Sequence, residues 1–172
     1  YDDGVLAITR WGFEPPRESV RLLTLAREAL AQLGEHEPWK HVMVVREGSQ
    51  KELEGWGARD TVLISRKPFT DADLNRAERF ISDARLQTVY LPTTGATNAF
   101  GQALRAKDLD AWLENYPFDV SPVDDNRPFF FYTVQPRDLW EFITTMNKDS
   151  ADYKINRAVP MLFSLVGVSL DR

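Results

Sequence analysis

Two adjacent acids and an arginine stand directly before three phenylalanines in the stretch 124–131, DDNRPFFF. Adjacent carboxylates repel each other unless a cation, hydrogen-bond donors or water hold them, whereas an apolar run of this kind has to be buried. Asp124, Asp125 and Arg127, together with Asp119, therefore predict one of two arrangements. They form a cluster that recognises an anion or an amine, or they form an ion pair and a turn that fix the chain ahead of the aromatic run.

A second group of such residues follows the first apolar run of the chain, where Arg10, Trp11 and Phe13 precede a pair of prolines. In an open α/β sheet the loop after the carboxyl end of a strand lies at the ligand crevice, so these side chains would face a bound substrate. Alternatively, the two aromatic rings cover the edge of the sheet or pack beneath the phenylalanine run. Arg10 and Trp11 are therefore candidate substrate-binding residues.

The composition excludes several kinds of chemistry. With no cysteine and two histidines in 172 residues, the chain has no thiolate ligand, disulfide or cysteine nucleophile, and too few imidazoles for a histidine-rich metal site. We therefore expect no bound metal, and we expect His41, at the start of a β-branched run, to be a hydrogen-bonded structural residue. The net charge of -5 also disfavours a nucleic-acid partner, which would require a dense basic face.

Strands and helices alternate through the rest of the sequence. Apolar, β-branched runs predict strands at 5–10, 41–46, 61–66 and 88–91, with a long, mobile connection over 48–60. Apolar residues at helical spacing predict one helix from the proline pair to Gly34, and another after Thr70, which forms a capping box with Asp73. Glu14, Arg17 and Glu18, around the start of the first helix, are expected to serve the helix dipole and solvent.

The resulting order, β-α-β-β-α-β, is that of a split βαβ unit, because a right-handed crossover leaves a gap between the first two strands that the third fills antiparallel. This α/β unit can close as a ferredoxin-like sandwich, with two helices over one face of a four-stranded sheet. It can equally be the C-terminal half of a methyltransferase-type sheet, which ends in a β-hairpin whose last strand inserts antiparallel. We expect a mostly helical C-terminal segment to follow.

Several of these segments together resemble one family. The sequences GVLAITRW (4–11), HVMVV (41–45) and TVLISRKPFT (61–70), the helix 16–33, and the stretch 116–131 are similar to the C-terminal part of bacterial membrane-integrated, spermidine-synthase-like proteins. The resemblance covers most of the chain, and DDNRPFFF is its most specific element. In that family several membrane helices accompany a Rossmann-type domain, which is similar to aminopropyltransferases and S-adenosylmethionine-dependent methyltransferases.

The resemblance implies that this chain is the half of such a domain that completes the sheet and lines the substrate pocket. The sequence lacks the glycine-rich turn and the acidic residue that would hold S-adenosylmethionine or decarboxylated S-adenosylmethionine, so the missing N-terminal half would bind that cofactor. Arg10, Trp11, Asp124, Asp125 and Arg127 are then expected in the pocket wall, and none of them is expected to be catalytic. The alternative is a non-catalytic, ferredoxin-like domain that regulates or scaffolds a membrane protein.

The ends of the chain add further expectations. The chain begins at Tyr1 without a signal segment and soon enters a strand, which is typical of an excised piece. The uncharged run 158–170 is too short to cross a bilayer, which takes about 20 residues, so it either packs on the core or begins a membrane helix. We therefore expect an α/β domain over 1–140, and a linker with an apolar segment over 141–172. We also expect the cytoplasmic domain of a bacterial inner-membrane protein, which self-associates through an exposed sheet edge.

Overall fold

The computed structural model describes residues 4–55, 57–124 and 133, and its contacts group residues 1–130 into one unit, to which the elements below belong. The main elements are β1 Val5–Gly12, α1 Glu18–Gln32, β2 Val42–Glu47, β3 Ala58–Ser65, α3 Asp71–Asp83 and β4 Gln87–Tyr90. Shorter elements are η1 Pro38–Lys40, α2 Gln50–Glu54, η2 Pro92–Thr94, α4 Ala99–Arg105 and α5 Leu109–Asn115. The predicted β-α-β-β-α-β order is confirmed. The expected boundary at 140 and the apolar run 158–170 lie outside the described residues.

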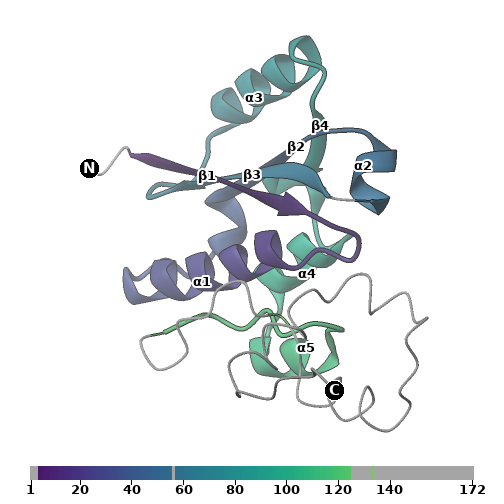
Figure 1. Cartoon of the computed structure of the whole chain (residues 1–172). Helices are drawn as coiled ribbons and strands as arrows, with labels where there is room; N and C mark the ends of the chain where they lie inside the picture. The colour runs from purple at the N-terminus through teal and green to yellow at the C-terminus, as the bar shows by residue number, and fades with distance from the viewer. Residues whose placement is uncertain (1–3, 56, 125–132, 134–172) are drawn as a thin grey trace, which may run out of the picture. The chain divides into compact units, whose positions relative to one another are not determined.

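The four strands form one sheet in the order β1-β3-β2-β4, and each neighbouring pair is antiparallel. β3 fills the gap between the parallel strands β1 and β2, as the split unit requires. α1 and α3 lie on opposite faces of this sheet (Figure 1). The ferredoxin-like alternative is therefore wrong, because it would place both helices on one face. The arrangement agrees with the methyltransferase-type alternative.

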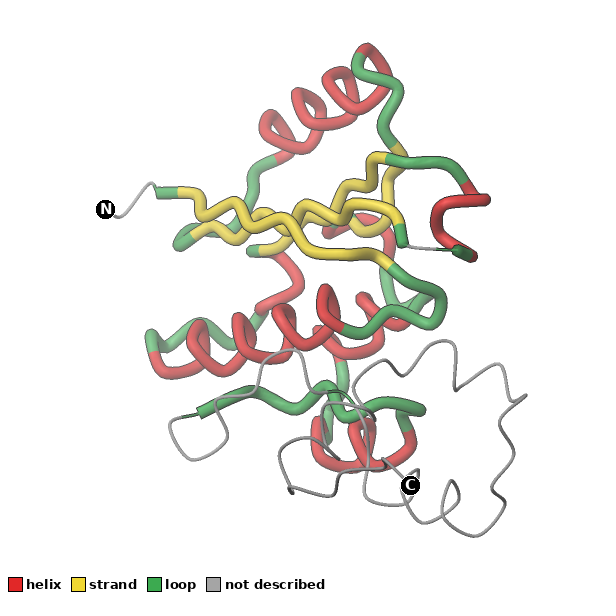
Figure 2. Tube along the Cα trace, in the orientation of Figure 1, coloured by secondary structure: helices red, strands yellow, loops and turns green. Residues whose placement is uncertain are grey.

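The handedness of the two crossovers explains why the helices lie on opposite faces. The connections β1-α1-β2 and β3-α3-β4 both advance in the same direction across the sheet, but β1 and β3 point in opposite directions. Crossovers between parallel strands are nearly always right-handed. Two right-handed crossovers that start from opposed strands must then pass over opposite faces, and Figure 2 shows the strands lying between the two long helices.

Side chains alternate across the sheet and supply a core on each face. Val42, Val44 and Val62 are fully buried on the α1 side. The intervening residues Met43 and Val45 pack with α3 instead, in a cluster with Leu63, Leu74 and Ile81. The α3 face is therefore covered over β2, whereas β1 is exposed along most of its length.

Local sequence sets the ends of α1 and α3. α1 ends at Gln32, and Gly34 terminates it with a φ of 85°, which suits glycine, while the Glu35 N–H donates to the Leu30 carbonyl at 2.9 Å. α3 begins with the predicted capping box, in which the Thr70 hydroxyl accepts from the Asp73 N–H at 3.3 Å and the Asp73 carboxylate accepts from the Thr70 N–H at 3.0 Å. Both predicted termini are confirmed.

The connection between β2 and β3 differs from the prediction. Instead of a long mobile loop it contains α2, and β3 begins earlier than expected, at Ala58. A second capping box starts α2, because the Glu52 side chain accepts from the Ser49 N–H at 2.7 Å and the Ser49 hydroxyl accepts from the Glu52 N–H at 3.2 Å. The signal for this helix was present in the spacing Ser-x-x-Glu. Within the part of the chain that the structure describes, no helix has the length and apolar character needed to cross a membrane.

Candidate functional site

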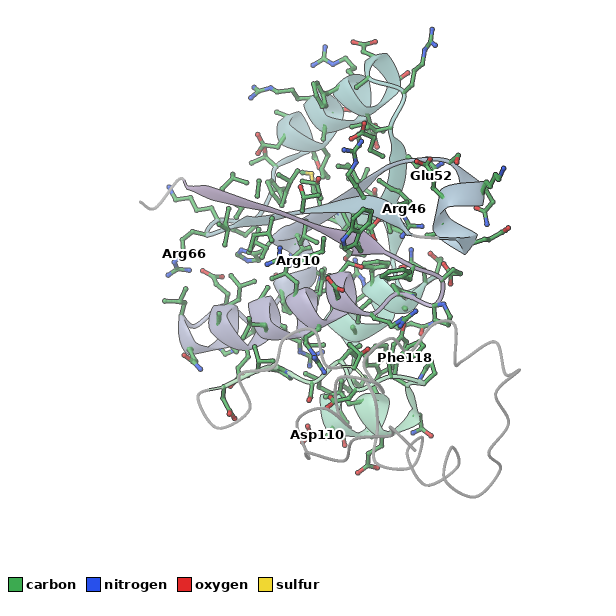
Figure 3. All side chains as sticks on the ribbon, in the orientation of Figure 1. Arg10, Arg46, Glu52, Arg66, Asp110 and Phe118 are labelled. Carbon is green, nitrogen blue, oxygen red and sulfur yellow. The ribbon has the colours of Figure 1, made fainter. Side chains whose placement is uncertain are left out.

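A row of charged residues crosses the sheet near the carboxyl ends of β1 and β2. Arg10 on β1 and Arg46 on β2 are both paired in register with Asp60 on the intervening strand β3, so the three side chains share the α1 face. Asp60 is fully buried, and both of its carboxylate oxygens accept hydrogen bonds from Arg46, at 2.6 Å from Nε and 2.9 Å from Nη2. Such a bidentate pair fixes the position of both groups. Figure 3 shows Arg10 between the sheet and α1.

The last residue of β1 has to be glycine because of this row. A Cβ atom added to Gly12 would lie 2.4 Å from Oδ1 of Asp60. Such a contact is far too short, and Asp60 cannot move away without losing its bonds to Arg46. Gly12 therefore lets the end of β1 pass directly over a buried carboxylate.

Glu18, in the first turn of α1, brings a second carboxylate to the same region. Burial raises the pKa of Glu18, although the positive charges of Arg10, Arg17 and Arg21 act in the opposite direction. Its Oε2 atom is buried and accepts no hydrogen bond within the described part of the chain. A buried oxygen without a donor is costly. Glu18 is therefore the acidic group of this site that is best suited to accept a hydrogen bond from a ligand.

The segment 116–121 is bound to the first half of α1. Arg21, whose side chain is 2% exposed, forms an ion pair with the Asp119 carboxylate at 3.3 Å and donates to the Asp119 carbonyl. The Arg17 guanidinium lies 4.7 Å from the ring centre of Phe13 and 4.7 Å from that of Phe118. Phe13 is thus packed against an arginine, and the first turn of α1 is held to segment 116–121 by charge and by aromatic stacking.

A buried tyrosine anchors the start of the same segment. The Tyr116 hydroxyl donates to the Pro16 carbonyl at 2.7 Å, just ahead of α1. The pKa of Tyr116 is raised, mainly by burial and also by the charge of Glu14, so the hydroxyl keeps its proton and remains a donor at all ordinary pH values.

The predicted site residues are not all brought together. Arg10 joins the charged row, but Trp11 is the next residue of the same strand and therefore lies on the α3 side of the sheet, where it is 52% exposed. Asp124 is exposed. Asp125 and Arg127 lie outside the described residues. Asp119, which the sequence grouped with Arg127, has Arg21 as an ion-pair partner.

The sequence interpretation missed Arg46 and Asp60, the bidentate ion pair of the site. A signal was present, because both residues occupy positions that alternate with fully buried valines, Arg46 after Val44 and Asp60 before Val62. A charge at an inward-facing strand position requires a partner in the interior. The expected strand at 61–66 began one residue too late to include Asp60.

The buried histidine, His41, has structural surroundings. His41 is fully buried, with Nδ1 3.1 Å from the Ser65 carbonyl and Nε2 3.5 Å from Oε2 of Glu35. Glu35 also forms an ion pair with Arg66 at 2.8 Å. His41 is therefore part of a group of polar contacts that joins the end of α1 to the end of β3. Among the residues that the structure describes, no three His, Asp or Glu side chains are grouped as metal ligands.

The cluster suits the recognition of a ligand better than nucleophilic chemistry. Four arginines and three acids lie on the sheet, on α1 and in segment 116–121: Arg10, Arg17, Arg21, Arg46, Glu18, Asp60 and Asp119. The turn from β1 to α1 does not suit a nucleotide-type cofactor, since Pro15 and Pro16 remove two of its backbone N–H donors. Comparison with protein-family models, curated proteins and solved structures gives no match for this chain.

Proposed function

We propose that this chain is the C-terminal part of a spermidine-synthase-like transferase, in which it completes the sheet and lines the substrate pocket. The order β1-β3-β2, with helices on both faces, supports this proposal because it is the order expected at the end of a methyltransferase-type sheet. The resemblance of the segments 4–11, 41–45, 61–70 and 116–131 to such proteins supports it independently.

The observation that carries the proposal is the position of the charged row. Ligands of open α/β sheets bind outside the carboxyl ends of the strands. Arg10 lies near that end of β1, and it faces the first turn of α1, where Glu18 has a buried oxygen without a hydrogen-bond donor in the described residues. In the proposed transferase Arg10 and Glu18 line the pocket, and the pair Arg46 and Asp60 holds the strand ends in place beneath them.

The remaining roles follow from the resemblance. Asp124, Asp125 and Arg127 form another part of the pocket wall, whereas Trp11 lies on the opposite face of the sheet from Arg10. S-adenosylmethionine or its decarboxylated form binds to another part of the transferase, because the turn after β1 does not suit it. The chain by itself is not catalytic, and its parent is a bacterial inner-membrane protein with this domain in the cytoplasm.

The coding sequence ahead of Tyr1 provides the first test. We expect it to encode a strand, a glycine-rich turn that opens a helix, and Asp or Glu about 20 residues further on. A full-length coding sequence without this arrangement would overturn the transferase and leave a regulatory or scaffolding domain.

Substitution of Arg10 provides the second test. In the full-length protein we expect Arg10→Ala to lower kcat/KM for methyl or aminopropyl transfer about tenfold or more, through loss of a pocket contact. Arg76→Ala is the matched control, because Arg76 is exposed on α3, across the sheet. Equal activity of the two variants would remove Arg10 from the pocket wall.

A further inference from the structure

The two edges of the sheet are protected to very different degrees. β4 is short, with four residues, and its pairing with β2 shifts register between Val44 and Val45. β1 has eight residues and pairs with β3 without any shift, from Val5 opposite Ser65 to Gly12 opposite Ala58. Proteins block open edges with short strands, bulges, lysines or prolines. β4 has two of these features, whereas β1 has none.

Exposed apolar side chains are concentrated on β1. Val5, Leu6 and Trp11 are 52%, 55% and 52% exposed. Ala7 and Thr9 are also exposed, and Arg10 is the only charged residue of the strand. Among the described residues β1 is hydrogen-bonded to β3 alone. A long, nearly uncharged edge without a bulge readily pairs with another strand.

We propose that the edge of β1 binds the β1 strand of a second copy of this chain, antiparallel, around a two-fold axis that passes at Ile8. In this register Val5 lies opposite Trp11 of the other copy, Leu6 opposite Arg10, and Ala7 opposite Thr9. In the pair, the exposed Val5 side chain of each copy therefore packs against the exposed Trp11 side chain of the other, and pairs of a β-branched and an aromatic residue stabilise sheets. It also keeps the two Arg10 side chains apart, so no like charges face each other across the axis.

Alternative symmetric registers pair the strand less completely. An axis at Arg10 would set the two guanidinium groups against each other, which is destabilising. An axis at Ala7 sets Val5 opposite Thr9, and an axis at Thr9 sets Trp11 opposite Ala7, so in neither register do Val5 and Trp11 cover each other. The strand is thus self-complementary in charge and in shape around Ile8.

The helices on the α1 face fit this arrangement. α1 packs against both β1 and β3, so it lies over the edge strand β1 and its neighbour. With strands about 4.8 Å apart, the two α1 helices of the pair would lie about 10 Å apart, which is the distance of packed helices. In the proposed transferase the same edge would instead join the rest of the sheet. The two occupants of the β1 edge are therefore alternatives, and the pairing of two copies does not rest on the proposed function.

Cysteine pairs introduced on β1 test the register directly, because the chain has no cysteine of its own. We expect a 1:1 mixture of Val5→Cys and Trp11→Cys to form a disulfide-linked dimer under mild oxidation, since opposite residues lie about 4.5–5.5 Å apart. Each variant alone should form little disulfide-linked dimer, because the two cysteines at position 5, or the two at position 11, would be separated by about 20 Å along the strands. No dimer in the mixture, or equal yields from each variant alone, would overturn the proposal.

Sedimentation velocity tests the pairing without cross-linking. We expect the unmodified chain to pass from monomer to dimer as its concentration rises, and Thr9→Lys to remain monomeric because a lysine blocks the edge. Ser82→Lys, at an exposed position of α3 over β2, adds the same charge away from β1 and should dimerise like the unmodified chain. A chain that stays monomeric, or a Thr9→Lys variant that dimerises equally well, would count against β1 as the interface.

Discussion

Asp60 and Glu18 show two ways of holding a carboxylate in the same region. Asp60 is fully buried, but both of its oxygens are bound by Arg46. Glu18 has three arginines in its surroundings, yet its buried oxygen accepts no hydrogen bond from the described residues, and burial raises its pKa. At the scale of single residues, Asp60 therefore has a structural role. Ionised Glu18 instead lowers the stability of the fold, and a ligand that donates a hydrogen bond to its buried oxygen would offset this cost.

Glu18→Gln tests this difference. Because the pKa of Glu18 is raised in the folded state, its contribution favours folding below the unfolded pKa and is lost as the pH rises through the folded pKa. We therefore expect Glu18→Gln to unfold at a higher temperature than the unmodified chain at pH 7, and the difference to disappear below about pH 4.

Circular dichroism melts across this pH range measure the effect, with Glu28→Gln as the control at an exposed position of the same helix. If Glu18→Gln were instead less stable at pH 7, the arginines would stabilise the carboxylate by more than its burial costs.

At the scale of elements, helix starts were predictable wherever a short spacing determines them. Thr70 and Asp73 form the capping box that their sequence predicts, and Ser49 and Glu52 form an equivalent one that was overlooked. The hydrogen bonds of Thr70 lower the pKa of Asp73, and those of Ser49 lower the pKa of Glu52. Each carboxylate thus stabilises its helix above its unfolded pKa, and this stabilisation is lost as the pH falls through its folded pKa.

Thr70→Ala should destabilise the chain through α3. Loss of the cap leaves a backbone N–H of the first turn without its acceptor, at a cost of about 1 kcal/mol, or about 2–4 °C in melting temperature for a chain of this size. Urea unfolding followed by circular dichroism measures the change. Ser82→Ala, exposed near the other end of α3, is the matched control. A Thr70→Ala variant as stable as this control would show that α3 does not depend on its cap.

At the scale of the whole described unit, the segment 116–121 determines how α1 is held from the side away from the sheet. Thr24 of α1 donates to the Val120 carbonyl at 2.6 Å, and Arg21 pairs with Asp119, both from fully or nearly fully buried positions. These contacts join residues that are 96 and 98 positions apart in the sequence. The segment that follows β4 and its helices is therefore part of the core of the unit.

Thr24→Val should weaken this connection with little change in shape. The variant leaves the Val120 carbonyl without its donor in the interior, so we expect a loss of roughly 1–2 kcal/mol in the free energy of unfolding. Thr88→Val, at an exposed position of β4, is the control and should stay within about 0.5 kcal/mol of the unmodified chain. Equal stabilities in urea titrations would indicate that segment 116–121 contributes little to folding.

The sequence by itself determined the order of strands and helices, the apolar face of α1 and its end at Gly34, and the capped start of α3. These features depend on residues within a few positions of one another, where spacing and side-chain type leave few alternatives. Only the tertiary structure placed β4 beside β2, put α3 on the face opposite α1, separated Trp11 from Arg10, and joined Arg46 to Asp60. Those features depend on strand direction, on register and on contacts between distant residues, and the pattern within a single segment does not specify which distant residue becomes a partner.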